Sequence, residues 1–180
     1  NRIPKRFNLD PISDIQILSP MHKGELGVKN LNSCLQNHLN PDQPFIEKFS
    51  TRYSLGDKVI QMVNNYDKSI FNGDIGHIIQ IDPPTNHVTV NFDGKTIAYN
   101  AHELDELQLA YACSIHKSQG SEYPAVIIPI SMQHYTLLQR NLIYTAITRG
   151  KQLVILIGEK KALHMAIQKQ DNQLRCTRLS

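Results

Sequence analysis

The chain has 180 residues, of which 41% are hydrophobic and 19% are charged, and its formal net charge is +3. This length and composition predict a soluble globular protein, formed by one domain or by one domain with a modest insertion. No apolar run is long enough for a transmembrane helix, and the N-terminal segment lacks the apolar core of a signal peptide. Cys34, Cys113 and Cys176 lie far apart and predict no metal site or disulfide framework, so we expect a cytoplasmic protein without membrane association.

Charge is unevenly distributed along the chain. Residues 55–106 carry three lysines and eight carboxylates, which gives a net charge of −5. The remaining residues carry 16 basic and eight acidic side chains, which gives a net charge of +8. We therefore expect a polyanionic partner to contact mainly the residues outside 55–106.

The first part of the chain predicts one strand and one helix. The segment DIQILSP, residues 14–20, is typical of a short buried strand that ends at Ser-Pro. After it, leucines recur near helical spacing and predict the buried stripe of a helix: Leu26, Leu31, Leu35 and Leu39. The segment NPDQP then ends the helical pattern.

Between residues 53 and 107 the pattern changes to short β-rich runs. DKVIQMV, GDIGHIIQID, HVTVNFD and KTIAYNA are separated by turn signals, of which Asp93-Gly94 is typical of a tight hairpin. Strands of this number and length predict a small antiparallel barrel.

Beyond residue 107, apolar runs alternate with helical patterns. LQLAYA, AVIIPI and LVILIG predict strands, YTLLQRNLIYTAITRG predicts a helix that Gly150 ends, and EKKALHMAIQKQ predicts a second helix. This alternation is typical of a parallel sheet covered on both faces. We therefore predict an α/β domain, residues 1–52 and 108–180, interrupted by the barrel at residues 53–107.

A polar loop, SIHKSQGSEYP, separates two of these predicted strands. Ligands of open parallel sheets bind at the carboxyl ends of the strands, where we expect this loop to lie. Gly120 leaves space for a phosphate, and the side chains of Ser114 and His116 can donate to phosphate oxygens. Gln119 can donate and accept hydrogen bonds, and Glu122 can accept them from a ribose.

Four segments of the chain resemble one protein family. SIHKSQGSEYPAVII resembles motif V of superfamily 1 helicases, and RNLIYTAITRGK resembles their motif VI. ILSPMHKGELGVKNLNSCLQ is similar to the motif IV region of the RecD/TraA-type (1B) branch. GDKVIQMVNNYDKSIFNGDIG is similar to the start of the SH3-like barrel that this branch inserts. The resemblance implies a RecA-like parallel sheet flanked by helices, interrupted by a small SH3-like antiparallel β-barrel: the second motor domain of an ATP-dependent DNA helicase.

The resemblance also implies roles for individual residues. Arg149 would be catalytic, because an arginine at the γ-phosphate of ATP stabilises the charge that develops in phosphoryl transfer. Gln119, Gly120 and Glu122 would complete the ATP-binding set, with Glu122 near the ribose. Ser114 and His116 would face the DNA backbone.

Four further residues are candidates for DNA binding. Lys23 and Gly24 lie at the predicted start of the first helix, where a helix N-terminus and a lysine favour phosphate. Tyr66 is positioned in a loop where it can stack on a base, and Asn65 lies beside it.

Each of these assignments has a structural alternative. Arg149 can instead cap the C-terminus of its helix, and Glu122 can pair with Lys117 on the surface. Asn65 and Tyr66 can serve only the geometry of a turn.

The sequence contains no GxxxxGK[ST] phosphate loop and no acidic Mg²⁺ motif paired with one. The family places both in its first motor domain, so we expect this chain to be a fragment that does not hydrolyse ATP alone. ATP and Mg²⁺ would be held mainly by the first RecA-like domain of the same polypeptide.

The resemblance implies translocation on single-stranded DNA in the 5′ to 3′ direction, in DNA repair or recombination. Nuclease or recombination subunits are the further partners implied. Two alternatives stay open. One is a non-enzymatic module that binds single-stranded DNA; the other is the motor of a multi-subunit exonuclease or a relaxase-linked helicase.

Overall fold

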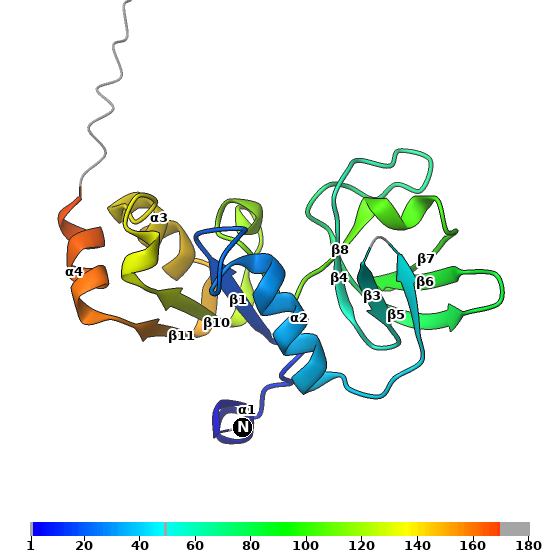
Figure 1. Cartoon of the computed structure of the whole chain (residues 1–180), viewed down its shortest axis with the longest axis horizontal. Helices are drawn as coiled ribbons and strands as arrows, with labels where there is room; N and C mark the ends of the chain where they lie inside the picture. The colour runs from blue at the N-terminus through cyan, green and yellow to red at the C-terminus, as the bar shows by residue number, and fades with distance from the viewer. Residues whose placement is uncertain (1, 49, 170–180) are drawn as a thin grey trace, which may run out of the picture.

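The computed structural model describes residues 2–48 and 50–169. Two β-rich bodies lie side by side, a parallel sheet with helices and an antiparallel sheet, as Figure 1 shows. The predicted fold class, an α/β fold with an antiparallel insertion, is therefore confirmed. Among the described helices, none has the length and apolar character needed to cross a membrane.

The parallel sheet has four strands in the order β11-β10-β1-β9. Every pairing within it is parallel. Its strands are β1 (Ile15–Ser19), β9 (Ala112–Ser114), β10 (Tyr123–Ile130) and β11 (Gly150–Gly158). The predicted strands near residues 14–20, 125–130 and 153–158 are thus confirmed.

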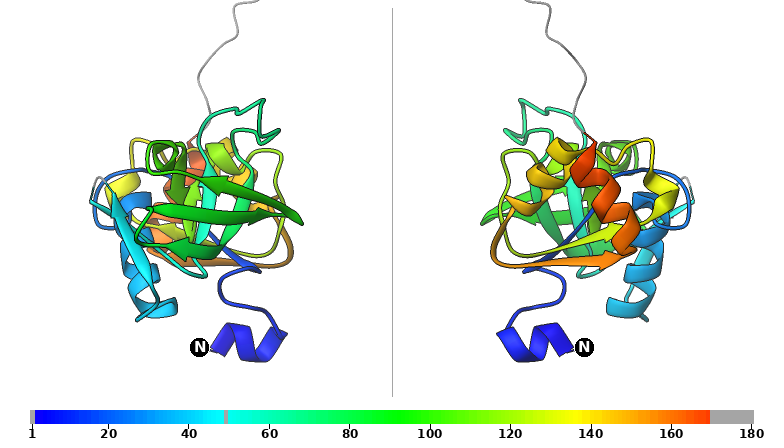
Figure 2. Two further views of the ribbon diagram at one scale, coloured as in Figure 1. Left: turned by 90° about the vertical axis from the view of Figure 1, so that its right-hand side faces the viewer. Right: turned by 90° about the vertical axis from the view of Figure 1, so that its left-hand side faces the viewer.

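Helices cover both faces of this sheet. Side chains along a strand point alternately to the two faces, so β10 contacts helices on each side. The helices are α1 (Arg2–Phe7), α2 (Val28–Leu39), α3 (Arg140–Ile147) and α4 (Lys160–Gln168). Val126, Ile128 and Ile130 are buried in the same cluster as residues of α3 and α4, and Figure 2 shows these two helices together on one side. Ile127 faces the other side, where it lines an apolar cavity with residues of α1 and α2.

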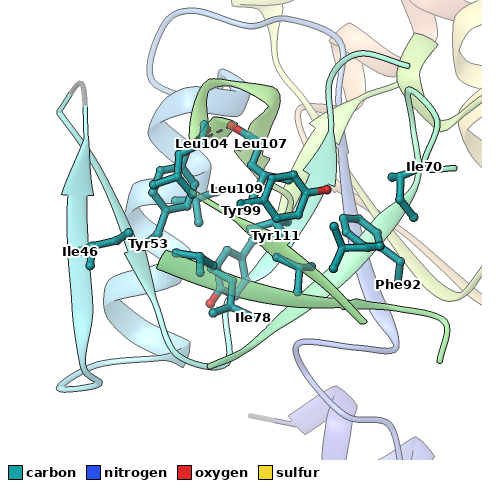
Figure 3. Packing of buried hydrophobic residues seen from close by; sticks show 14 residues of the cluster. Ile46, Tyr53, Ile70, Ile78, Phe92, Tyr99, Leu104, Leu107, Leu109 and Tyr111 are labelled. Carbon is teal, nitrogen blue, oxygen red and sulfur yellow. Dashed lines mark hydrogen bonds between the residues drawn. The ribbon is translucent and has the colours of Figure 1, made fainter. Parts of the chain in front are cut away.

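The antiparallel sheet has five strands in the order β7-β6-β5-β4-β8. They are β4 (Lys58–Gln61), β5 (Ile75–Asp82), β6 (His87–Phe92), β7 (Lys95–Tyr99) and β8 (Leu107–Leu109). Its core gathers Tyr99, Tyr111 and Phe92 with aliphatic residues (Figure 3). Asp93 and Gly94 both have positive φ, as a tight β6–β7 hairpin requires, so that prediction is confirmed.

A two-stranded hairpin that the sequence did not predict lies beside this sheet. It consists of β2 (Phe45–Lys48) and β3 (Thr51–Ser54). Ile46 and Tyr53 are buried in the barrel core, and the Tyr53 hydroxyl donates to the carbonyl oxygens of Leu104 and Leu107. The hairpin therefore belongs to the packing of the barrel.

Three predictions about individual elements are wrong or incomplete. LQLAYA is not one strand: β8 belongs to the antiparallel sheet, and β9 belongs to the parallel sheet. The chain changes sheets at Ala110 and Tyr111, because Ala110 N–H donates to the Lys58 carbonyl, and the Tyr111 carbonyl accepts from Ile17 N–H. The helix expected to start near residue 135 starts at Arg140, since Gln139 is extended and the 3-10 helix η3 (Met132–His134) precedes it.

The third correction concerns α2, whose buried face is not the leucine stripe. Its buried residues are Val28, Asn32 and Gln36, and all four leucines of the stripe are half-buried. The reason is that α2 lies against both sheets where the chain passes between them. Unpaired backbone groups at that place require polar partners.

We call this contact region the seam; it contains Asn32 and Gln36 of α2, the C-cap residue Asn40, Asp57, Lys58 and Tyr111. The Asn32 amide donates to the carbonyl oxygens of Leu109 and Ala112, at 2.9 Å in both cases, and accepts from Ala112 N–H. Asn32 therefore joins the end of β8 to the start of β9.

Two neighbouring charged residues are buried in the seam. The Asp57 carboxylate accepts from the side chains of Gln36, Asn40 and Tyr111 and from Ser54 N–H, while burial raises its pKa. Lys58 is 2% exposed, and burial lowers its pKa to about 8. Its ammonium donates to the carbonyl oxygens of Ser13 and Ile15, so Lys58 fastens β4 to the start of β1.

Two further predictions, on the three cysteines and on the last helix, concern some residues that the structure does not describe. Cys34 is exposed and Cys113 is buried, whereas Cys176 lies outside the described residues. The predicted helix EKKALHMAIQKQ corresponds to α4, and its final position, residue 170, is also outside them.

Candidate functional site

The loop between β9 and β10 runs along one face of the parallel sheet. Ser114, at the carboxyl end of β9, pairs with Ser19 at the carboxyl end of β1. Tyr123 begins β10 and lies on the amino side of the pair Ile15–Ala125. The expectation that the whole loop lies at the carboxyl ends is therefore wrong. Because β9 and β10 are parallel with β1 between them, the chain must return to the amino edge.

The first half of the loop lies at the carboxyl edge. It contains the 3-10 helix η2 (His116–Ser118). His116 and Gln119 line a cavity of about 280 Å³ together with Pro20, Asn141 and Thr145. The hydroxyl of Ser114 is buried here and accepts from Lys117 N–H. A predicted DNA-binding residue, His116, and a predicted ATP-binding residue, Gln119, thus share one cavity.

The second half of the loop lies beside Arg149 at the amino edge. Gly120 has φ +88°, and nothing lies within 4 Å of the position of a Cβ atom there, so the backbone is open to a ligand. Glu122 forms an ion pair with Lys151, with 3.2 Å between Oε2 and Nζ. The alternative pairing of Glu122 with Lys117 is therefore wrong.

Arg149 follows the C-terminus of α3, and its guanidinium is held by backbone and hydroxyl oxygens. Nη1 donates to the Ser121 carbonyl at 3.2 Å, Nε to the Thr145 carbonyl at 3.3 Å, and Nη2 to the Thr148 hydroxyl at 3.2 Å. Among the described residues, no carboxylate pairs with it. The bond to Thr145 is the capping contact of the structural alternative, but the positive charge stays available to an anion.

Lys23 and Gly24 lie in the loop between β1 and α2, which also leaves the carboxyl edge. The helix does not begin at these residues: its N-cap is Gly27, and Val28 is the first helical residue. Gly24 has positive φ, and its carbonyl accepts from Gly27 N–H in a turn. A phosphate bound by Lys23 would therefore contact the backbone of this turn rather than the first turn of the helix.

Asn65 and Tyr66 lie in the loop that follows β4. The Asn65 amide donates to Glu106 at 3.1 Å and accepts from Lys68 N–H, so this side chain shapes the loop. Tyr66 is 75% exposed and contacts Phe71 edge to face.

Phe71 and Lys151 are residues of the site that the sequence did not predict. Phe71 meets Tyr66 because the loop after β4 folds back on itself, and Lys151 meets Glu122 because β11 pairs with β10. A local sequence pattern shows neither of these contacts.

Solved structures share this arrangement of sheets. Pif1 helicases solved in a study of DNA unwinding at forked double-stranded DNA align with a TM-score of 0.57 and 20% identity, over 88% of this chain and 44% of theirs. Pif1 helicase from Candida albicans aligns with a TM-score of 0.56 and 17% identity, over 87% and 49%. These structures therefore share the fold of this chain, a RecA-like parallel sheet interrupted by a small antiparallel barrel.

Sequence comparisons identify the helicase family that the chain resembles. The family model "ATP-dependent RecD-like DNA helicase SH3 domain" matches residues 31–92, and "UvrD-like helicase C-terminal domain" matches residues 109–157. The ATP-dependent RecD2 DNA helicase of Deinococcus radiodurans is 36% identical over 87% of this chain and 22% of its own length. The RecBCD enzyme subunit RecD of Mycolicibacterium smegmatis is 28% identical over 92% and 29%.

The chain belongs to the RecD-like DNA helicases. It spans between about a fifth and a third of the length of these two relatives.

Proposed function

We propose that this chain is the C-terminal motor domain of an ATP-dependent DNA helicase that translocates on single-stranded DNA in the 5′ to 3′ direction. In this proposal residues 1–52 and 108–180 form the second RecA-like domain, and residues 53–107 form the SH3-like insertion. The β2–β3 hairpin packs on this insertion, and its sheet extends through β8 to Leu109. The family membership supports a helicase motor, and the direction follows from the RecD/TraA-type resemblance alone.

The observation that carries the proposal is the position of Arg149. Its guanidinium lies at the amino edge of the sheet, without a carboxylate partner among the described residues, and near the open backbone of Gly120. An unneutralised arginine at an open edge is suited to stabilise the charge on the γ-phosphate of ATP. ATP and Mg²⁺ would be held mainly by the first RecA-like domain, with Glu122 near the ribose.

The helix α3 connects this edge to the cavity at the opposite edge. Asn141 and Thr145 line that cavity with His116, and Thr145 also accepts from the Arg149 guanidinium. A movement of Arg149 on ATP hydrolysis would therefore act on the cavity through the same helix. In the proposed function His116 contacts the DNA backbone at the carboxyl edge, and Lys23 and Gly24 contact it from the neighbouring loop. The buried Ser114 would act there by holding the turn that carries His116.

The test is ATP hydrolysis stimulated by single-stranded DNA, measured on the full-length protein with and without the change Arg149→Ala. We expect hydrolysis to fall by about two or more orders of magnitude, because the γ-phosphate loses its arginine, while DNA binding is retained. Arg140→Ala is the matched control: Arg140 is exposed at the first position of the same helix, so its loss should leave hydrolysis nearly unchanged.

Near-normal hydrolysis by Arg149→Ala would contradict the proposal. The chain would then be better described as a non-enzymatic module that binds single-stranded DNA. Its binding should depend strongly on salt, because phosphate contacts release counterions.

The names of the relatives support two settings for the whole protein. A RecD2-like helicase acts as one polypeptide in our proposal, whereas a RecD-like subunit would work with nuclease or recombination subunits in DNA repair. Purification of the full-length protein from its own cells, followed by measurement of the mass of the assembly, distinguishes the two.

A further inference from the structure

An exposed aromatic pair projects from the barrel on the loop between β4 and β5. Tyr66 is 75% exposed and Phe71 is 47% exposed. Their ring centroids are 6.2 Å apart with an interplanar angle of 77°, so the edge of one ring meets the face of the other. Val63, on the same loop, is 48% exposed. These three side chains offer an uncharged contact surface on one loop.

The loop holds the aromatic pair in a fixed geometry. Asn65 and Ile70 exchange two backbone hydrogen bonds, which close the turn that carries Tyr66. The Asn65 side chain is bonded to Glu106, and Phe71 N–H donates to the carboxylate of Asp74. A ring that is already oriented loses little conformational entropy when it binds a ligand.

The loop is also joined to the polar loop of the parallel sheet. The Lys117 ammonium donates to the Asn72 side-chain oxygen at 3.1 Å and lies 3.5 Å from the sulfur of Met62. Lys117 belongs to η2, next to His116 of the cavity at the carboxyl edge. In Figure 1 the loop after β4 and the loop after β1 both lie along the upper side of the molecule. The aromatic pair therefore continues the proposed DNA-binding edge onto the barrel.

We propose that Tyr66, supported by Phe71, stacks on a base of the single strand that crosses this edge. The inference rests on the proposed function, because that function brings the strand to His116. Residues 55–106 carry a net charge of −5, and Asp67 is the neighbour of Tyr66, so phosphate is disfavoured there. A base offers an uncharged face to an aromatic ring, and such stacking is tolerant of sequence. The ligand chemistry is thus a nucleobase.

The test is the affinity of the full-length protein for an oligothymidylate, compared with an abasic strand of the same length. Tyr66→Ala should raise the Kd for oligothymidylate roughly 5- to 100-fold, because one base loses its stacking partner. The same variant should bind the abasic strand as the wild type does. The slope of log Kd against log salt should not change, since no phosphate contact is lost.

Two matched variants serve as controls. Tyr66→Phe keeps the ring and should bind oligothymidylate like the wild type. Phe45→Ala removes an aromatic ring of 47% exposure on β2, away from this loop, and should also leave the affinity unchanged. Because Tyr66 is exposed, its loss should not change the urea midpoint of the protein.

Equal binding of oligothymidylate by Tyr66→Ala and the wild type would overturn the inference, and it is the result expected if the pair docks a protein instead. A loss of equal size on the abasic strand would also overturn it, since the ring would then contact the backbone. Failure of the proposed function is visible separately, as normal ATP hydrolysis by Arg149→Ala or as no binding of single strands by the wild type.

Discussion

The interior of the parallel sheet and the seam beside the barrel are both buried, yet they are built from opposite kinds of side chain. Between the sheet and its helices lie aliphatic residues such as Val126 and Ile128. In the seam lie an asparagine, a carboxylate and an ammonium: Asn32, Asp57 and Lys58. Apolar burial is non-directional and stabilises any close packing, whereas buried hydrogen bonds require particular partners. The comparison suggests that the sheet contributes stability and that the seam determines how the barrel is attached.

The largest effect should come from removing the carboxylate of the seam. Asp57→Ala leaves the side-chain donors of Gln36, Asn40 and Tyr111 without their acceptor in a buried place. We expect a loss of about 4 kcal/mol in the free energy of unfolding. Urea unfolding followed by circular dichroism measures it, and Asp67→Ala, at an exposed position, is the control. A loss below about 1 kcal/mol would show that the seam does not depend on this group.

The second effect is a pH dependence that belongs to Lys58. Burial lowers the pKa of this lysine from 10.5 to about 8 in the folded protein, which corresponds to about 3 kcal/mol. Between these pH values the unfolded chain binds more protons than the folded one, so stability rises with pH. The penalty of burying the charge is fully present below about pH 8 and is relieved as the pH approaches 10.5.

Comparison of the wild type with Lys58→Met measures this contribution together with the effect of the ammonium on Cys113, whose pKa it lowers. The variant should gain stability relative to the wild type at pH 7, and the gain should shrink by about 3 kcal/mol between pH 7 and pH 10.5. The lost bonds to Ser13 and Ile15 shift the curve without changing its slope. A difference that is independent of pH would mean that Lys58 is not charged and buried at pH 7.

The smallest effect should come from trimming the aliphatic interior. Ile128 is fully buried in the cluster of the sheet, and Ile128→Val removes one methylene group. We expect a loss of about 1 kcal/mol, measured by the same urea unfolding. Ile167→Val, at a position 52% exposed on α4, should cost less. If Ile128→Val cost as much as Asp57→Ala, the contrast between sheet and seam would fail.

The parts of the fold that were predictable are those in which a local pattern decides the structure. The apolar run AVIIPI is typical of a buried strand, and Asp93-Gly94 allows the two positive φ angles of a tight hairpin. The buried face of α2 was not predictable, because the partners of Asn32 lie 77 and 80 residues away. For the same reason the leucine stripe was mistaken for the buried face.

The candidate site was predictable in its residue types and only partly in its geometry. Motif spacing indicated Arg149 and Glu122, but the pairing of Glu122 with Lys151 depends on β11 lying next to β10. The division of LQLAYA between two sheets was not predictable from the sequence, because both halves of this segment are apolar. Gly24 and Gly27 mark a turn before α2, and this signal was present in the sequence and was misread as the start of the helix.

The hydrogen bond from Ala110 N–H to the Lys58 carbonyl, at 2.8 Å, brings the two ends of the barrel segment together. A segment whose ends are neighbours can be lost or gained by a chain without displacing the strands on either side. Here, however, its removal would leave the buried amides of Gln36 and Asn40 without the Asp57 carboxylate. Asn32 would lose the Leu109 carbonyl but keep its two bonds to Ala112 of β9. Shortened forms of this chain should therefore persist only where Gln36 and Asn40 have been replaced by apolar residues. Deletion of the barrel and replacement of these two amides have to occur together.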